Sequence, residues 1–152
     1  MDKISLDRLQ MLDPAVRESA IAAYMECWEA GLHTRITRSY SSIEQQNEIY
    51  AQGRTKPGKI VTWAKGGDSI HNYRLAVDFV LLHPDKGTVS WSMSEDIDND
   101  HVPDWMEVVA IWKKHGWQWG GDWPKPKTDP PHLQKTLGLS LADLKAGKKP
   151  QV

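Results

Sequence analysis

The sequence predicts an α+β fold in which helices pack on a small antiparallel sheet. Two amphipathic helical segments, one apolar segment of strand length and a Pro/Gly-rich connection before that segment support this prediction. With 152 residues, the chain is long enough for one hydrophobic core. We therefore expect a single domain over residues 1–152, with a core of about 5–140 and a C-terminal tail that frays.

Composition and charge exclude several classes of protein. The 19 Lys and Arg residues nearly balance the 20 Asp and Glu residues, so bulk charge provides no attraction for nucleic acid. We expect neither a secretory signal nor a membrane span, because the N-terminal segment has scattered charges and no apolar run. A single cysteine, Cys27, excludes an internal disulfide framework. Any metal must therefore be bound by histidines and carboxylates.

The first elements are predicted from capping signals and helical spacing. Asp13 followed by Pro14 is typical of an N-cap and a first helical residue, and apolar residues recur at helical spacing until Gly31. Residues 32–37 alternate partly and include β-branched side chains, which favours a strand. An amphipathic helix followed by a strand is therefore expected over this part of the chain.

A second helix, a long connection and a buried strand are predicted next. Ser42 and Gln45 form the pattern of a capping box, which opens a helix that Gly53 ends. Residues 54–69 carry few core-forming signals, and connections of that length are often functional. Residues 75–82 read LAVDFVLL, an apolar run of strand length. This run is the best candidate for a buried strand.

The last part of the chain predicts one more helix and two short elements. An amphipathic pattern begins at Pro103 and ends at Gly116, and Trp117 and Trp119 then alternate as in a short strand. A short helix is expected near Lys145. The eight tryptophans favour large core side chains over stacking surfaces for a substrate.

Asp78 is the residue that physical chemistry singles out. It lies within the most apolar segment of the chain, where an ionised carboxylate is costly unless a cation or a metal pairs with it. His71 lies in the loop before this strand and could fold back over the same face. A pair between Asp78 and Arg74, with an exposed His71, is the alternative that spacing leaves open.

A second candidate segment is TDPPHLQ at residues 128–134. Adjacent prolines disfavour a helix and favour an extended, polyproline-like path with three residues per turn. On such a path Asp129 and His132 project from the same side. A metal ligand and a base could thus be held on one stiff segment, although an ordinary Pro-rich surface loop is the alternative.

These two segments resemble the motifs of a known family. Residues 69–78, SIHNYRLAVD, resemble the S-x-H-x-x-G-x-A-x-D motif of the LAS metallopeptidases, which include phage L-alanyl-D-glutamate endolysins and bacterial D-Ala-D-Ala carboxypeptidases. Residues 129–132, DPPH, resemble the second motif, an acidic residue three positions before a histidine. The stretches YAQGRTKPG at 50–58 and GGDW at 120–123 are similar to the phage branch. The likeness spans roughly residues 35–134.

The resemblance implies a LAS/hedgehog-like peptidase fold with a zinc site at the sheet. It implies Zn²⁺ held by His71, Asp78 and His132, with a fourth position open for water, as expected of catalytic zinc. Asp129 would move a proton from the water to the leaving amine. The implied activity is that of an endolysin-like peptidoglycan peptidase that hydrolyses the L-alanyl-D-glutamate bond.

Two departures from the family pattern concern substrate binding. The usual glycine of the first motif is Arg74, and the arginine of the family's T-x-G-x-R stretch is replaced by Ser41. We expect Arg38 or Arg74 to supply the missing guanidinium near the oxyanion. The expected substrate-binding residues are Ser69, Arg38, Tyr40, Arg74 and Trp123.

Three other functions compete with this peptidase activity. The GRTKPG stretch favours an endopeptidase over a D,D-carboxypeptidase that removes terminal D-Ala, and a degenerate wall-binding module stays open. An Fe(II) oxygenase is disfavoured, because its triad begins H-x-D/E whereas six residues separate His71 from Asp78.

We expect a monomer whose partner is the peptidoglycan stem peptide. It would be made in the cytoplasm and act on the cell wall after holin-type release.

An acidic segment near residue 100 is similar to a calcium-binding loop. Asp96, Asp98 and Asp100 alternate, and Glu107 follows eleven residues after the first of them. His101 occupies the position at which an EF-hand needs glycine. The pattern therefore favours a solvated acidic run that caps the following helix.

Overall fold

The structure is a computed structural model that describes residues 1–151, and it confirms the α+β class. The helices are α1 (Lys3–Leu9), α2 (Pro14–Glu29), α3 (Ile43–Ala51), α4 (Asp104–Lys114) and α5 (Leu141–Lys145), with two 3-10 helices, η1 (Ile70–Tyr73) and η2 (Gly120–Asp122). The strands are β1 (Thr34–Arg38), β2 (Ala76–His83), β3 (Thr88–Ser90), β4 (Gln118–Trp119) and β5 (His132–Gln134). All strand pairs are antiparallel.

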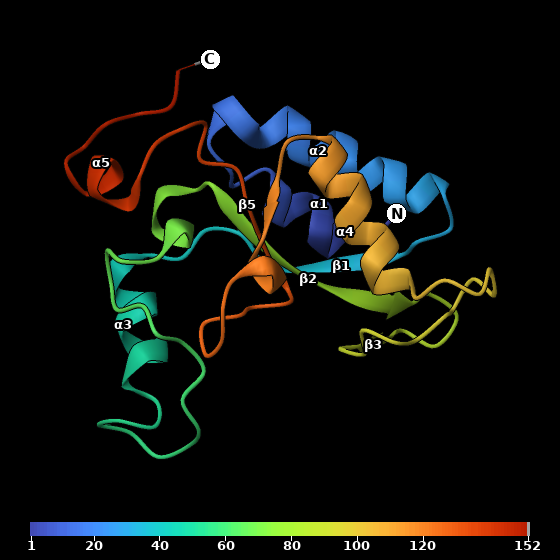
Figure 1. The fold of residues 1–152 in the computed structure, drawn as a ribbon, viewed down its shortest axis with the longest axis horizontal. Coiled ribbons are helices and arrows are strands. Elements are labelled where there is room, and N and C mark those ends of the chain that lie inside the picture. Colours follow the sequence, from blue (N-terminus) through green and yellow to red (C-terminus); the bar gives the residue numbers. More distant parts are fainter. Residues whose placement is uncertain (152) are drawn as a thin grey trace.

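The five strands form one sheet with β2 at its centre. The order is β1-β2-β5-β4, and β3 pairs with the far end of β2. Helices α1, α2 and α4 gather on one side of this sheet, whereas α3 and the loop after it extend away from the other side (Figure 1). Phe79 of β2 packs its ring on Trp105 of α4, with ring centroids 4.5 Å apart. Because strand side chains alternate, Asp78 points to the face without these helices.

The hydrophobic core lies between the sheet and the helices α1, α2 and α4. Half of the eight tryptophans are buried in it: Trp105, Trp112, Trp117 and Trp119. Cys27 of α2 is also fully buried, and burial raises the pKa of its thiol to about 12. The cysteine is therefore a small core side chain and not a nucleophile.

Capping signals in the sequence correctly located the N-termini of two helices, α2 and α3. The Asp13 side chain accepts a hydrogen bond from the Ala15 amide at the start of α2. Ser42 and Gln45 form a complete capping box at the start of α3. The alternating Trp117–Trp119 pattern corresponds to β4, and the strand predicted over 75–82 is β2, displaced by one residue.

Helix α1 and strand β3 are among the elements that were not predicted, because each is short and depends on tertiary contacts. Helix α1 has only seven residues, and its N-cap Asp2 forms an ion pair with Arg35 of β1 at 2.9 Å. The Ser5 hydroxyl of α1 accepts a hydrogen bond from the Ile36 amide at 2.9 Å. Strand β3 has three residues at one end of β2. Isolated segments of these lengths are not stable by themselves.

The prediction of a polyproline-like path for residues 129–132 was wrong. The His132 amide donates to the Asp129 carbonyl at 3.1 Å, which closes a tight turn around the two prolines. The turn forms because β5 begins at His132 and must pair with β2.

Within residues 1–151, no helix is both long and apolar enough to cross a membrane.

Candidate metal centre

Three ionisable side chains form a row across the sheet. Arg38 of β1 and His132 of β5 both lie directly opposite Asp78 of β2. Residues directly opposite one another in antiparallel strands project from the same face, so the row stands on the face away from α1, α2 and α4. The central strand thus places the carboxylate between a guanidinium and an imidazole.

A β-bulge brings Arg38 into this row. Ile36 pairs with Phe79, but the register shifts between Ile36 and Arg38, so that Arg38 pairs with Asp78. Ile36 is fully buried in the core. In a regular strand Arg38 would share the core face of Ile36, and one extra residue moves it to the opposite face.

His71 is the third candidate metal ligand, beside Asp78 and His132. It comes from η1, directly before β2. The Ser69 hydroxyl accepts a hydrogen bond from the His71 amide at 3.2 Å and caps this helix. Arg74 ends the helix with φ of 63°, in the left-handed region where the family motif has glycine. Its guanidinium packs on the Tyr40 ring at 3.9 Å and donates to the Met11 carbonyl at 2.9 Å, which holds the strained residue in place.

The lone pairs of three side chains converge at one point. His71 Nδ1 donates to the Ser39 carbonyl at 2.8 Å, so its Nε2 carries a lone pair toward Asp78. His132 Nε2 contacts the Gln134 Oε1 acceptor at 2.8 Å, so its Nδ1 also faces Asp78 with a lone pair. A buried cluster of acceptors without a cation would be strongly unfavourable.

The distances are close to those of a tetrahedral metal site. Asp78 Oδ1 is 3.1 Å from His71 Nε2 and 3.3 Å from His132 Nδ1. Ligands at about 2.0–2.2 Å from zinc in a tetrahedron lie roughly 3.3–3.6 Å from one another. All three ligand atoms lie within 4.8 Å of one another, so the group could hold a metal ion. Two nitrogens and one oxygen match the ligands of catalytic zinc sites.

The electrostatics of the three residues agree with a cation site. Burial opposes ionisation of Asp78, but when His71 and His132 are protonated in place of binding a cation, their charges and hydrogen bonds outweigh burial, and the pKa of Asp78 lies well below its usual range. Burial also disfavours a charged His132, yet Asp78 raises the pKa of this imidazole. Asp78 is therefore ionised at neutral pH and attracts positive charge to this point.

Asp129 stands beside this group on the 129–132 turn. Its Oδ2 is 3.9 Å from His132 Nδ1, and the side chain is 47% exposed to the cleft and solvent. Burial and the negative charge of Asp78 raise the pKa of Asp129, against the opposing effect of the histidines. A carboxyl with a raised pKa that is also accessible is suited to proton transfer.

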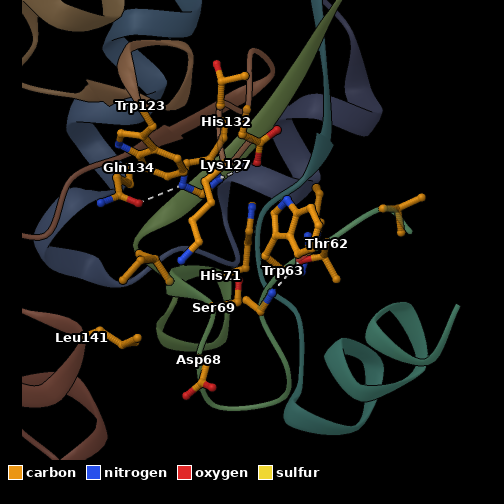
Figure 2. Close-up of a pocket in the computed structure, with 16 residues that line it drawn as sticks. Thr62, Trp63, Asp68, Ser69, His71, Trp123, Lys127, His132, Gln134 and Leu141 are labelled. Carbon is orange, nitrogen blue, oxygen red and sulfur yellow. Dashed lines mark hydrogen bonds and ion pairs between the residues drawn. The ribbon is translucent and has the colours of Figure 1, made fainter. Parts of the chain in front are cut away.

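His71, His132 and Asp129 line a cleft of about 510 Å³. Figure 2 shows His71 and His132 pointing into it, with Trp123 on one wall and Trp63 on the other. The Trp123 ring packs on His132, with ring centroids 5.1 Å apart. The remaining lining residues include Arg38, Val61, Thr62, Asp68, Ser69, Lys127, Gln134 and Leu141.

The structure separates the expected substrate-binding residues into two groups. Ser69, Arg38 and Trp123 line the cleft. Tyr40 and Arg74 pack on one another outside its lining, and the alternative pair of Arg74 with Asp78 does not form. Sequence reasoning missed Lys127, Gln134 and Trp63, because nothing in the local pattern indicates that loops 61–64 and 123–128 face one another.

A second acidic group lies before α4. Asp96, Asp98, Asp100 and Asp104 could also bring ligand atoms within 4.8 Å of one another. The expectation that Asp96, Asp98 and Asp100 cap α4 was wrong, because Pro103 occupies the N-cap and no side chain caps the helix. Their carboxylates instead accept hydrogen bonds from amides within the loop itself, such as His101 N to Asp96 at 2.8 Å.

Comparison with known proteins agrees with this geometry. A family profile described as D-alanyl-D-alanine carboxypeptidase matches residues 62–135. The peptidoglycan L-alanyl-D-glutamate endopeptidase CwlK of Bacillus subtilis (strain 168) is 46% identical over 123 residues, which are 81% of this chain and 72% of that protein. The profile match includes both motifs of the candidate metal centre.

Solved structures show the same fold at low sequence identity. The L-Ala D-Glu endopeptidase ChiX of Serratia marcescens superposes with a TM-score of 0.62 at 19% identity, covering 95% of this chain and 92% of that chain. VanYB in complex with D-Alanine-D-Alanine superposes with a TM-score of 0.59 at 15% identity, covering 90% and 77%. The fold expected from the sequence is therefore confirmed.

A small antiparallel sheet with two histidines and a carboxylate converging on its open face defines a metallopeptidase. The identity with the Bacillus protein, over most of both chains, makes the assignment more specific. The chain belongs to the LAS metallopeptidases, the family that its two motifs indicated.

Proposed function

We propose that the protein is a zinc-dependent peptidoglycan peptidase that hydrolyses the L-alanyl-D-glutamate bond of stem peptides. The observation that carries this proposal is the convergence of lone pairs from His71, Asp78 and His132 on one point beside Asp129. The choice of bond is supported by the 46% identity with a relative that bears this activity in its name. The protein would act on this substrate at the cell wall.

In this proposal, His71, Asp78 and His132 are the zinc ligands. Zinc bound there would polarise the scissile carbonyl and lower the pKa of a water molecule. Asp129 would accept a proton from the attacking water at its carboxylate and deliver it to the leaving amine. Its raised pKa favours the second half of this task, because a weaker acid holds the proton until the amine departs.

Arg38, Ser69 and Trp123 are the proposed substrate-binding residues. Arg38 donates from Nε to Ser41 Oγ at 2.7 Å and lies 3.9 Å from Asp78, so its charge is fixed at the edge of the ligand set. A guanidinium held in this way can stabilise negative charge on a scissile carbonyl oxygen. Trp123 forms an apolar wall over His132. All these groups come from one chain, so we infer that a monomer with one catalytic domain is active.

The mass of the fragments released from purified peptidoglycan tests the proposal. The zinc-loaded protein should produce fragments with a new N-terminal D-glutamyl residue. Chelator should abolish their release, and added zinc should restore it. Asp129→Asn should lower the rate by about 10²–10⁴-fold through loss of proton transfer. This variant should still bind one zinc ion.

Other products would favour the alternatives. The family profile is described as a D-alanyl-D-alanine carboxypeptidase, and release of free D-Ala without internal cleavage would identify that activity. Zinc-loaded protein that binds the wall but releases no fragment would identify a binding module. Either result would contradict the proposed endopeptidase.

A further inference from the structure

The cleft contains one cation that the protein itself leaves without a partner. Arg38 and Lys127 are the two basic side chains that line it. Arg38 bonds Ser41 and Gln46 and lies 3.9 Å from Asp78. Among residues 1–151, the Lys127 ammonium has no ion pair or hydrogen bond to any side chain or carbonyl. It is therefore free to bind an anion.

The backbone that carries Lys127 is fixed relative to the metal ligands. The Lys127 amide donates to the Pro124 carbonyl at 3.0 Å, and the Thr128 hydroxyl donates to the Gly121 carbonyl at 3.3 Å. The next amide, of Asp129, donates to the Gly120 carbonyl at 2.9 Å. From this anchored segment the Lys127 side chain extends across the cleft (Figure 2). Its charge thus lies among the groups that would contact substrate.

The proposed substrate offers a matching anion. A glutamyl residue has two carboxyl groups, and only one of them is used when the residue is linked onward in a peptide. A D-glutamyl residue at the cleavage point therefore has a free carboxylate on the residue whose amine leaves. Resting on the proposed function, we infer that Lys127 binds this carboxylate and thereby selects D-glutamate over its amidated form.

The other charged groups of the cleft do not suit this role. Asp68 lines the cleft, but Lys145 of α5 pairs with it at 2.7 Å, so both charges are already satisfied. Arg38 already bonds Ser41 and Gln46, and in the proposed function it faces the scissile carbonyl oxygen. The Asp129 carboxyl group is negative or takes up a proton during the reaction, so it does not attract a substrate carboxylate. Lys127 is the remaining cation that can meet a substrate carboxylate without displacing a partner.

Two soluble stem peptides test this inference: one contains D-glutamate at the cleaved position and the other contains D-isoglutamine, in which the free carboxylate is an amide. The zinc-loaded wild-type protein should have the lower KM for the D-glutamate peptide. Lys127→Met should raise that KM by roughly five- to tenfold, the range for one charged contact at a partly solvated site. It should change neither kcat nor the KM for the amide peptide, while Lys127→Arg should keep the preference.

Lys65→Met is the matched control, because Lys65 is an exposed lysine of the opposite loop that does not line the cleft. It should leave both KM values unchanged. Equal KM changes on the two peptides in Lys127→Met, or none, would overturn the inference while leaving the proposed function intact. Failure of wild-type protein to cleave either peptide would overturn the proposed function itself, and the inference with it.

Discussion

At the scale of single residues, the position of Arg38 depends on one irregularity in β1. The bulge between Ile36 and Arg38 turns the guanidinium from the core face to the face of Asp78. Arg38 Nε donates to the Ser41 hydroxyl, at the position where the family pattern has arginine. The two residues together place a guanidinium near the position that a longer side chain at residue 41 would reach.

Arg38→Ala should therefore impair catalysis, with little effect on zinc binding. Loss of a fixed donor at an oxyanion typically lowers kcat by about 10²–10³-fold, and we expect kcat/KM on the D-glutamate peptide to fall by that order. Arg74→Ala is the control, because Arg74 packs on Tyr40 outside the cleft lining. Its activity per folded molecule should stay within about threefold of wild type, a range in which no transition-state contact is lost. Equal rates for wild type and Arg38→Ala would contradict the role given to this residue.

Gln134 orients His132, one of the candidate metal ligands. Its Oε1 holds His132 Nε2 at 2.8 Å, which directs the lone pair of Nδ1 toward Asp78. Removal of such outer partners of a metal-binding histidine typically costs about 10–100-fold in metal affinity. Gln134→Leu should therefore weaken zinc binding by at least about tenfold, measured by competition with a chelating dye.

Gln118→Leu is the matched control for Gln134. The Gln118 side chain accepts a weaker, 3.3 Å hydrogen bond from Gln134 Nε2 and does not touch the ligand set. Zinc affinity should change much less in this variant. Wild-type zinc affinity in Gln134→Leu would show that the strand alone orients His132.

At the scale of elements, the candidate site depends on the close packing of the 129–132 turn on η2. A Cβ atom added to Gly120 would lie 2.4 Å from the Asp129 carbonyl oxygen and 3.0 Å from His132 Cβ. No side chain fits into that space without movement of the turn. Gly120 is thus required for its size, since it allows the segment that carries Asp129 and His132 to lie directly on η2.

Gly120→Ala should therefore damage the site more than the fold. Displacement of the turn by a fraction of an ångström would misplace Asp129 and His132, and such shifts can cost about 10²-fold in rate. The measurements are kcat/KM and zinc affinity, together with circular dichroism to confirm the fold. Gly31→Ala, with φ of 81° and open space around its Cβ, is the control that costs stability but leaves activity per folded molecule unchanged. Full activity in Gly120→Ala would contradict this account.

At the scale of the whole molecule, the acidic residues at the start of α4 make stability depend on pH. Burial and the neighbouring carboxylates raise the pKa of Glu107 to about 7. A carboxyl whose pKa is raised by folding destabilises the fold when it ionises. The cost is absent below the unfolded pKa near 4.5, grows as the pH rises toward 7, and is constant above that.

Glu107→Gln should consequently raise the thermal unfolding midpoint at pH 8 and leave it unchanged at pH 4. The comparison should be made in chelator, because a bound divalent cation would neutralise the same charges. Glu18→Gln, on the exposed side of α2, is the control for loss of one glutamate carboxyl away from this acidic group. A stabilisation by Glu107→Gln that is the same at pH 4 and pH 8 would show that ionisation of this residue is not the cause.

Much of the fold could be predicted because its signals are local. The Asp13 and Ser42 caps, the helical periodicity before Gly31 and the apolar run of β2 each reflect interactions within a few residues of one another. Helix α1 and strand β3 could not be predicted, because each is too short to be stable alone. Both form through contacts with β1 and β2.

The sequence by itself determined that Asp78 needs a cationic partner, since a charge in an apolar strand is costly wherever that strand lies. Motif order indicated His71, Asp129 and His132 as its companions. Only the tertiary structure decided that these side chains share one face with Arg38, and that Tyr40 and Arg74 do not line the cleft. The reason is physical: strand register, a single bulge and the approach of two distant loops are set by packing between segments, which local patterns do not encode.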